Sequence, residues 1–170
     1  MATNLQFIKS ESISTNTTAF DITDCFGVGY DVYYLAFQNF NSTSGGNTIK
    51  IRFLDSSNNP ITASEYDWAY LNLNSASSFV ETKAVNQNII NFGTTGTGSS
   101  LMNTSAYIYN PDDTNSYTFL SSQGANRDSG LEGRKQISVL TQSSVIIGIR
   151  VDSGSTNMSE GTLSVYGVKG

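Results

Sequence analysis

Apolar and polar residues alternate along most of this chain with the two-residue period of a β-strand. The clearest case is Thr48–Phe53, where the odd-numbered positions are Ile, Ile and Phe and the even-numbered positions are Thr, Lys and Arg. No segment shows the 3.6-residue period of a helix. The pattern predicts one all-β domain over residues 1–170, a jelly-roll-like β-sandwich of about ten antiparallel strands joined by short polar turns.

The C-terminal stretch Val145–Lys169 shows strong alternation, and the prediction is organised around it. Its first half places Ile149 and Val151 on one face, and its second half places Leu163 and Val165 on one face, with a polar turn between the halves. Side chains of a strand point alternately to opposite sides, so each half should bury one face. We expect a strand–turn–strand unit here.

Two further segments have patterns of a different kind. Asp31–Phe40 has apolar residues on both faces, which predicts a central strand that is covered on both sides. Gln123–Gly133 is polar and contains three glycines, and of all segments it best fits a long loop.

Composition and charge exclude several classes of function. The formal net charge is −5 at pH 7 and the nine Lys and Arg residues are scattered, so we expect no contact with nucleic acid, which needs clustered basic residues. The sequence has no His and a single cysteine, Cys25, which excludes Cys-based zinc sites and an intrachain disulfide. We expect Cys25 to be a small core residue beside Phe26, and we expect no metal and no cofactor.

The N-terminal residues lack the basic and apolar regions of a signal peptide, and no apolar run reaches membrane-spanning length. We therefore expect synthesis in a cytoplasm and no membrane contact. The abundance of Ser, Thr and Asn with few charges is typical of proteins that work outside cells. Lysis of a host cell would reconcile the two observations.

Asp112, Asp113 and Asn115 form a short acidic segment with two interpretations. Calcium takes oxygen ligands from flexible loops, so these side chains are candidate ligands. Asp and Asn are also ordinary turn residues, and one short loop rarely supplies the six or more oxygens that calcium needs. We favour an exposed turn without metal.

Tyr66, Trp68 and Tyr70 share one face of a predicted strand. They are a candidate subunit interface or glycan-binding face, because aromatic rings offer flat contact area with a polar handle. The alternative, which we favour, is that they pack in the core, since aromatic residues are ordinarily enriched in strands.

No arrangement of residues points to catalysis. The chain has neither a Ser-x-x-Lys nor a Gly-x-Ser-x-Gly motif, and without His it lacks the commonest general base. A set of scattered acids shows no pattern of paired carboxylates: Glu65, Asp67, Glu81, Glu132 and Glu160. The nine Tyr and nine Phe exceed what one small core needs, so we expect a homo-oligomer, with a trimer as one form.

Five short segments carry a resemblance to a known family. They read Phe-Ile-Lys-Ser at Phe7–Ser10, Tyr-Asp-Val-Tyr at Tyr30–Tyr33, and Tyr-Ile-Tyr-Asn-Pro at Tyr107–Pro111. Two further segments, Gly148–Gly154 and Gly161–Lys169, each begin with glycine. In these segments the chain resembles small virion proteins encoded by tailed bacteriophages, many of them phages of marine bacteria. The segments are short, but they span nearly the whole chain.

The resemblance implies a β-sandwich structural protein of the phage particle and supplies no catalytic residues. The expected place is the virion surface, where the protein would decorate or cement the capsid by binding phage capsid or tail proteins. An alternative is a fibre-like head, neck or tail appendage that binds a host surface glycan or another receptor. A third, from another class, is a cryptic polysaccharide-degrading enzyme.

Overall fold

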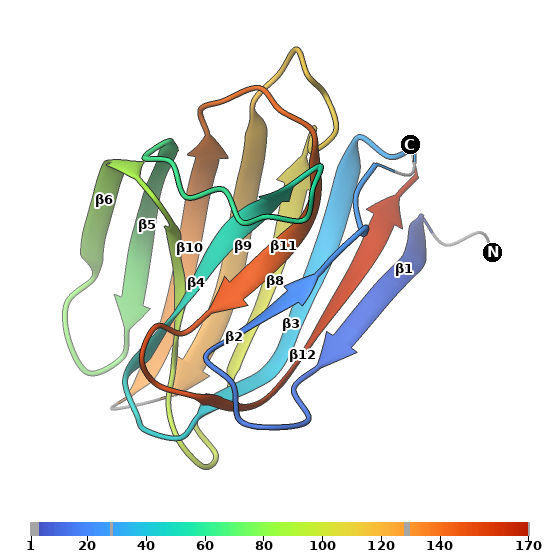
Figure 1. Cartoon of the computed structure of the whole chain (residues 1–170). Coiled ribbons are helices and arrows are strands. Elements are labelled where there is room, and N and C mark those ends of the chain that lie inside the picture. The colour runs from blue at the N-terminus through green and yellow to red at the C-terminus, as the bar shows by residue number, and fades with distance from the viewer. Residues whose placement is uncertain (1–3, 28, 128–129, 170) are drawn as a thin grey trace.

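The computed structural model describes residues 4–27, 29–127 and 130–169, and all regular structure in these ranges is β-strand (Figure 1). The strands are β1 (Leu5–Ser12), β2 (Ala19–Ile22), β3 (Val32–Ser42), β4 (Asn47–Asp55), β5 (Tyr66–Asn74), β6 (Val80–Gln87), β7 (Ile90–Thr95), β8 (Met102–Tyr109), β9 (Thr118–Arg127), β10 (Leu131–Leu140), β11 (Ile146–Asp152) and β12 (Met158–Val168).

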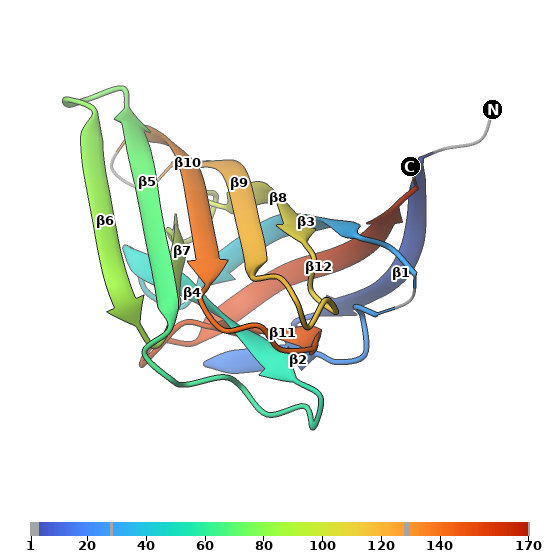
Figure 2. The same ribbon diagram turned by 90° about the horizontal axis from the view of Figure 1, so that it is seen from above.

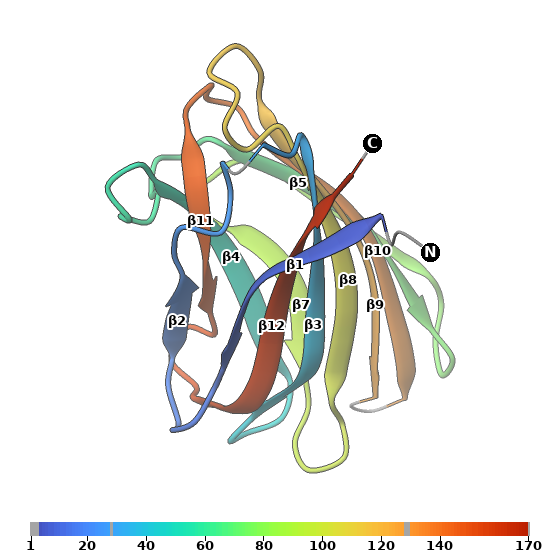
Figure 3. The same cartoon turned by 90° about the vertical axis from the view of Figure 1, so that its right-hand side faces the viewer.

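The strands form two antiparallel sheets that pack face to face (Figure 3). The large sheet has eight strands in the order β1-β12-β3-β8-β9-β10-β5-β6, and the small sheet has four in the order β2-β11-β4-β7. The predicted all-β sandwich is confirmed, with twelve strands rather than about ten. The jelly-roll designation stays an interpretation, which the nested order favours: β1-β12-β3-β8 lies over β2-β11-β4-β7, and two inserted hairpins widen only the large sheet.

The hydrophobic core lies between the sheets. From the large sheet, β3 contributes Tyr33, Leu35 and Phe37, all essentially without solvent exposure. Phe37 meets Phe92 of the small sheet with ring centroids 4.6 Å apart. Cys25 and Phe26 are both buried here, as predicted.

Tyr66 ties the two sheets together by hydrogen bonds as well as by packing. It begins β5 of the large sheet, and its side chain is fully buried. The backbone N–H of Phe53, on β4, donates to the Tyr66 hydroxyl over 3.1 Å, and that hydroxyl donates to the carbonyl oxygen of Ile61 over 3.2 Å. The aromatic ring thus fills the core while its polar end satisfies one backbone group of the small sheet and one of the β4–β5 connection.

The C-terminal stretch consists of two strands, as predicted, but they lie in different sheets. β11 pairs with β2 and β4 in the small sheet, whereas β12 pairs with β1 and β3 in the large one. The polar turn between them therefore crosses from one layer to the other. The predicted inward residues Leu163 and Val165 are fully buried, and so are Ile149 and Val151.

The prediction of a long loop at Gln123–Gly133 is wrong. β9 continues to Arg127 and β10 begins at Leu131, so most of the segment is a strand pair, and residues 128 and 129 lie outside the described residues. The reason is that this hairpin turns polar side chains inward. The side-chain amide of Asn126, for example, donates to the Thr94 carbonyl at the edge of the small sheet over 2.6 Å. The segment therefore lacks the alternating apolar residues by which a strand is recognised in a sequence.

Replacing Tyr66 by Phe should lower the free energy of unfolding by about 1–3 kcal/mol, because the change keeps the ring but leaves the buried Phe53 N–H without its partner. Chemical denaturation monitored by circular dichroism would measure the difference. Tyr30→Phe is the matched control, since its hydroxyl donates to Gln6 in an exposed pair. Equal effects of the two changes would contradict the role given to Tyr66.

Candidate binding surfaces

The three aromatic residues of β5 share one face, as predicted, but they do not form an open platform. Tyr66 is buried in the core and so is closed to a ligand or a second subunit. Trp68 packs against the core and stacks on Tyr70, with ring centroids 5.6 Å apart and planes at 8°. The Arg134 guanidinium lies 3.8 Å from the Tyr70 ring centroid. Tyr70 therefore packs between Trp68 and Arg134.

Arg134 belongs to a polar cluster on the inner face of the large sheet. Its Nε donates to the Asn72 side chain and its Nη1 to the Asn91 side chain on β7, each over 3.1 Å. Burial lowers the pKa of the guanidinium from its ordinary value, while Tyr70 and Glu132 oppose that shift. Asn126 donates to the Thr94 backbone carbonyl of β7 and Arg134 donates to the Asn91 side chain of the same strand, so the cluster is a structural contact between layers.

The acidic segment between β8 and β9 forms a turn. Asp113 accepts a hydrogen bond from the Asn115 backbone N–H over 2.8 Å, and Asn110 adopts a positive φ of 55°. Asp112 and Asp113 are half-buried and Asn115 is exposed. Among the described residues, no three acidic, Cys or His side chains are grouped so that they could hold a metal ion.

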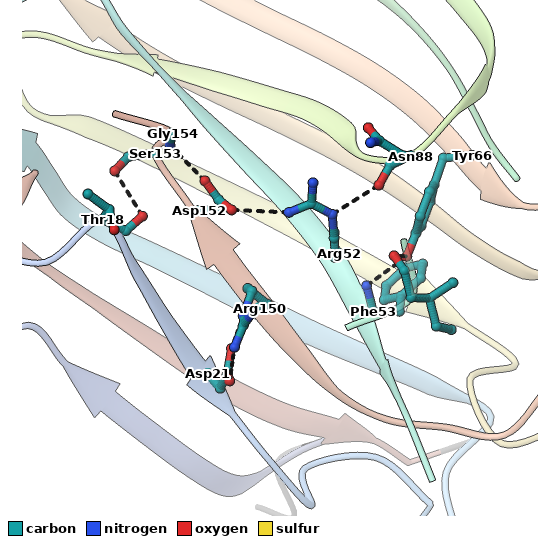
Figure 4. A network of polar contacts seen from close by, with 11 residues as sticks. Thr18, Asp21, Arg52, Phe53, Tyr66, Asn88, Arg150, Asp152, Ser153 and Gly154 are labelled. Atoms are coloured by element: carbon teal, nitrogen blue, oxygen red, sulfur yellow. Dashed lines mark hydrogen bonds and ion pairs between the residues drawn. The ribbon is translucent and has the colours of Figure 1, made fainter. Parts of the chain in front are cut away.

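The outer face of the small sheet is charged (Figure 4). Arg150 makes two parallel hydrogen bonds to Asp21 on the neighbouring strand, of 2.7 and 2.8 Å, and these bonds raise the pKa of its guanidinium. Arg52 makes an ion pair of 3.1 Å with Asp152 and donates to the Asn88 carbonyl. These pairs hold β2, β11 and β4 together on a surface suited to water.

The outer face of the large sheet is aromatic. Tyr166 on β12 lies opposite both Phe7 on β1 and Tyr34 on β3, and Tyr34 lies opposite Tyr107 on β8. The successive ring centroids are 5.7, 6.0 and 5.3 Å apart. Phe7 is 58% exposed and Tyr107 is 41% exposed, while Tyr34 and Tyr166 are half-buried by one another. We call these four residues the aromatic row.

Exposed apolar side chains continue the aromatic row across the sheet. Phe119 on β9 lies opposite Tyr109 on β8. Ile137 on β10 lies on the same face, with two-thirds of its surface exposed. Ile137 and Phe119 border a shallow hollow together with Val139 and Val85. A face of this width and apolarity is unusual on a protein that works alone in solution.

The aromatic row was missed by reasoning from the sequence, because its members come from four strands that are distant along the chain. The sequence held one indication of this surface: β3 has apolar residues on both faces, which predicts that both faces are buried. The central position of β3 is confirmed, since β12 and β8 flank it. Its outer face is half-exposed, however, and no described part of the chain forms a layer over it.

Comparisons with known proteins add little to this description. No family model matches the chain, and no curated protein matches it. Among solved structures, a crystal structure of an exo-inulinase from Aspergillus awamori has a TM-score of 0.49 and 10% sequence identity, over 95% of this chain and 29% of that chain. A likeness of this size carries no conclusion about activity. No helix in the described residues could span a membrane.

Cys25 is the single thiol, and its surroundings make it unreactive. The side chain is fully buried, and burial raises the pKa of the thiol to about 12, although Lys9 acts in the opposite direction. The thiolate is the nucleophilic form, so very little of the reactive species exists near neutral pH.

We expect the folded protein to resist labelling by a thiol reagent at pH 8, and to react with one equivalent after denaturation, because both burial and the raised pKa must be lost first. A time course followed by mass spectrometry would test this, with Ser12→Cys on exposed β1 as the positive control. Labelling of native Cys25 at the rate of the control would show that the core opens.

Proposed function

We propose that this protein is a structural component of a bacteriophage particle that binds another particle protein through the outer face of its large sheet. The observation that carries the proposal is the aromatic row. Phe7, Tyr34, Tyr107 and Tyr166 place neighbouring rings on a sheet face that no described part of the chain covers. Tyrosine and phenylalanine are enriched in protein interfaces, where burying their surface supplies most of the binding free energy.

The contrast between the two outer faces supports this orientation. The small sheet presents ion pairs such as Arg150 with Asp21. The aromatic row lies on the opposite side of the sandwich. A protein attached to a particle needs one face that contacts the particle and another that faces water. The large sheet provides the first face and the small sheet the second.

The sequence resemblance supports the choice of a phage particle. Phe7, Tyr107 and Tyr166 lie within segments that resemble the virion proteins, and Tyr34 directly follows another such segment. Segments far apart along the chain thus meet at one surface. The nested strand order also favours a jelly roll, an architecture that is frequent in viral capsid proteins, although fold alone does not determine function.

A second candidate function is that of an appendage that binds a host glycan. The observation that favours it is the chemistry of the aromatic row, in which Tyr34, Tyr107 and Tyr166 combine flat rings with hydroxyl groups. Such side chains suit a ligand that is apolar on one side and polar at its edges. Both candidates act by binding, and neither requires catalysis by the acids of the chain.

The double change Tyr34→Ser and Tyr107→Ser should reduce incorporation into particles at least tenfold, because losing two buried interface rings typically costs more than about 2 kcal/mol. Phage lacking the gene, complemented with each variant, would be purified and the bound protein counted by quantitative mass spectrometry. Tyr117→Ser is the matched control, since Tyr117 is exposed and lies in the β8–β9 connection outside the aromatic row.

Two properties of the depleted particles separate the candidate functions. A capsid cement predicts earlier loss of DNA on heating with normal adsorption. An appendage predicts normal heat stability with poor adsorption to the host. Absence of the wild-type protein from purified particles would reject the proposal, and so would normal incorporation of the double variant.

A further inference from the structure

β6 forms one end of the large sheet and pairs only with β5 (Figures 1 and 2). Along its other edge, no strand of the described residues pairs with it. Exposed apolar side chains lie in this strand and directly before it, which is unusual for an open edge: Val80 is 50% exposed, Val85 60%, and Phe79, which precedes β6, 70%. An edge of this kind is a template for pairing with another strand.

The sequence of this edge is symmetric in chemical character. In Phe79-Val80-Glu81-Thr82-Lys83-Ala84-Val85 an acid and a base flank Thr82, and two apolar residues follow on each side. An antiparallel copy of the segment therefore complements it. We propose that β6 pairs with β6 of a second copy of this chain, about a two-fold axis at Thr82.

The register of such a pair follows from the symmetry. Glu81 lies opposite Lys83 of the second copy, and the axis generates this ion pair twice. Phe79 lies opposite Val85 of the second copy, and Val80 opposite Ala84. Directly opposed residues in antiparallel strands have Cβ atoms about 4.5–5.5 Å apart, close enough for these charges and apolar groups to meet. Every exposed apolar residue of the edge gains an apolar partner.

The structure also limits the pairing to this segment. Asn86 adopts a positive φ of 53°, and its backbone N–H donates to the Asp67 side chain over 2.8 Å. It lies at the register shift between Tyr66 and Trp68, where the strand departs from regular geometry. The last regular β5–β6 pair is Trp68 with Ala84, so regular geometry along β6 ends there and Val85 begins the irregular segment. A sliding register would lose apolar or charge matches without gaining new ones.

The other sheet ends do not offer an equivalent edge. β1, at the opposite end of the large sheet, contains a register shift between Phe7 and Lys9. β2 has only four residues. The edge of β7 is occupied at Thr94, whose carbonyl accepts from Asn126. β6 is therefore the end best suited to self-association, and it gives a two-fold dimer in place of the trimer considered from composition.

The proposal concerns the edge of the sheet and does not depend on docking by the aromatic row. Sedimentation of the purified chain should show a concentration-dependent dimer. Glu81→Lys or Lys83→Glu alone should each weaken dimerisation about tenfold or more, because two attractive pairs become two repulsive ones. The double change Glu81→Lys with Lys83→Glu should restore it, because the pairs are regenerated with their signs exchanged.

Mixing the two single variants gives the sharpest result. The Glu81→Lys chain and the Lys83→Glu chain each repel their own copies, but they complement one another and should form a mixed dimer. Glu11→Lys, on the free edge of β1, makes the same charge change at the other end of the sheet and should leave the dimer unchanged. A monomeric wild-type chain, or single variants that dimerise normally and fail to prefer one another, would overturn the proposal.

Thr82→Cys provides an independent test of the register. A cysteine on the two-fold axis faces its own copy, so mild oxidation should give a disulfide-linked dimer, while buried Cys25 stays unmodified. Ala84→Cys, two residues off the axis, keeps both ion pairs and should crosslink at least tenfold more slowly. Equal crosslinking at both positions would show that the chains meet by collision and not in this register.

Discussion

The structure depends on one constraint: the large sheet has two faces with apolar side chains, and the chain provides one layer to cover them. Phe37, Leu35 and Tyr33 of β3 turn toward the small sheet and lose essentially all contact with water. The alternate residues of the same strand, Tyr34 among them, turn outward. Apolar surface on this second face contributes stabilisation only when another molecule covers it, because the hydrophobic effect comes from removing apolar surface from water.

The inner face of the large sheet is itself only partly covered, because the four strands of the small sheet are too few to span the eight strands of the large one. At the β9–β10 hairpin, beyond β7, the inner side chains of the large sheet are polar, whereas Leu120, Leu140 and Tyr66 keep the other ends of β9, β10 and β5 apolar. Ser122, Asn126, Arg134 and Gln136 replace the aliphatic residues of β3 and β12. Arg134 and Asn126 then bond to the exposed margin of the small sheet. The difference in width between the sheets thus explains why the β9–β10 hairpin lacks an apolar face.

The sequence predicts the strands well because alternation is a local property. Ile49, Ile51 and Phe53 must lie on one side of a strand whatever surrounds it, and all three are buried. Alternation does not state which sheet a strand joins. Val151 and Leu163 belong to equally clear patterns and lie in different layers, because that choice depends on partners distant in the chain.

The candidate site was harder to predict for the same reason. Trp68 and Tyr70 are two positions apart in a single strand, so the sequence shows them as a cluster on one face, yet they pack inward. The aromatic row is created by strand order: the registers of β1, β12, β3 and β8 bring Phe7, Tyr166, Tyr34 and Tyr107 into one line. In the sequence, each of these residues is one outward-facing aromatic residue among many. The pairing of the four strands brings them together into one surface.

The edge and the outer face are geometrically linked. A two-fold axis that joins two antiparallel edge strands runs perpendicular to the sheet, so both large sheets would turn the same face to the same side. Pairing at Thr82 would thereby place both aromatic rows on one side of the dimer, toward the two ends of the combined sheet, and the charged small sheets on the opposite side. Two weak contacts held in one rigid unit bind far more tightly than either alone, because the second forms without a new loss of translational freedom. Self-association through β6 would therefore strengthen attachment to a repeating surface without adding any residue to the contact.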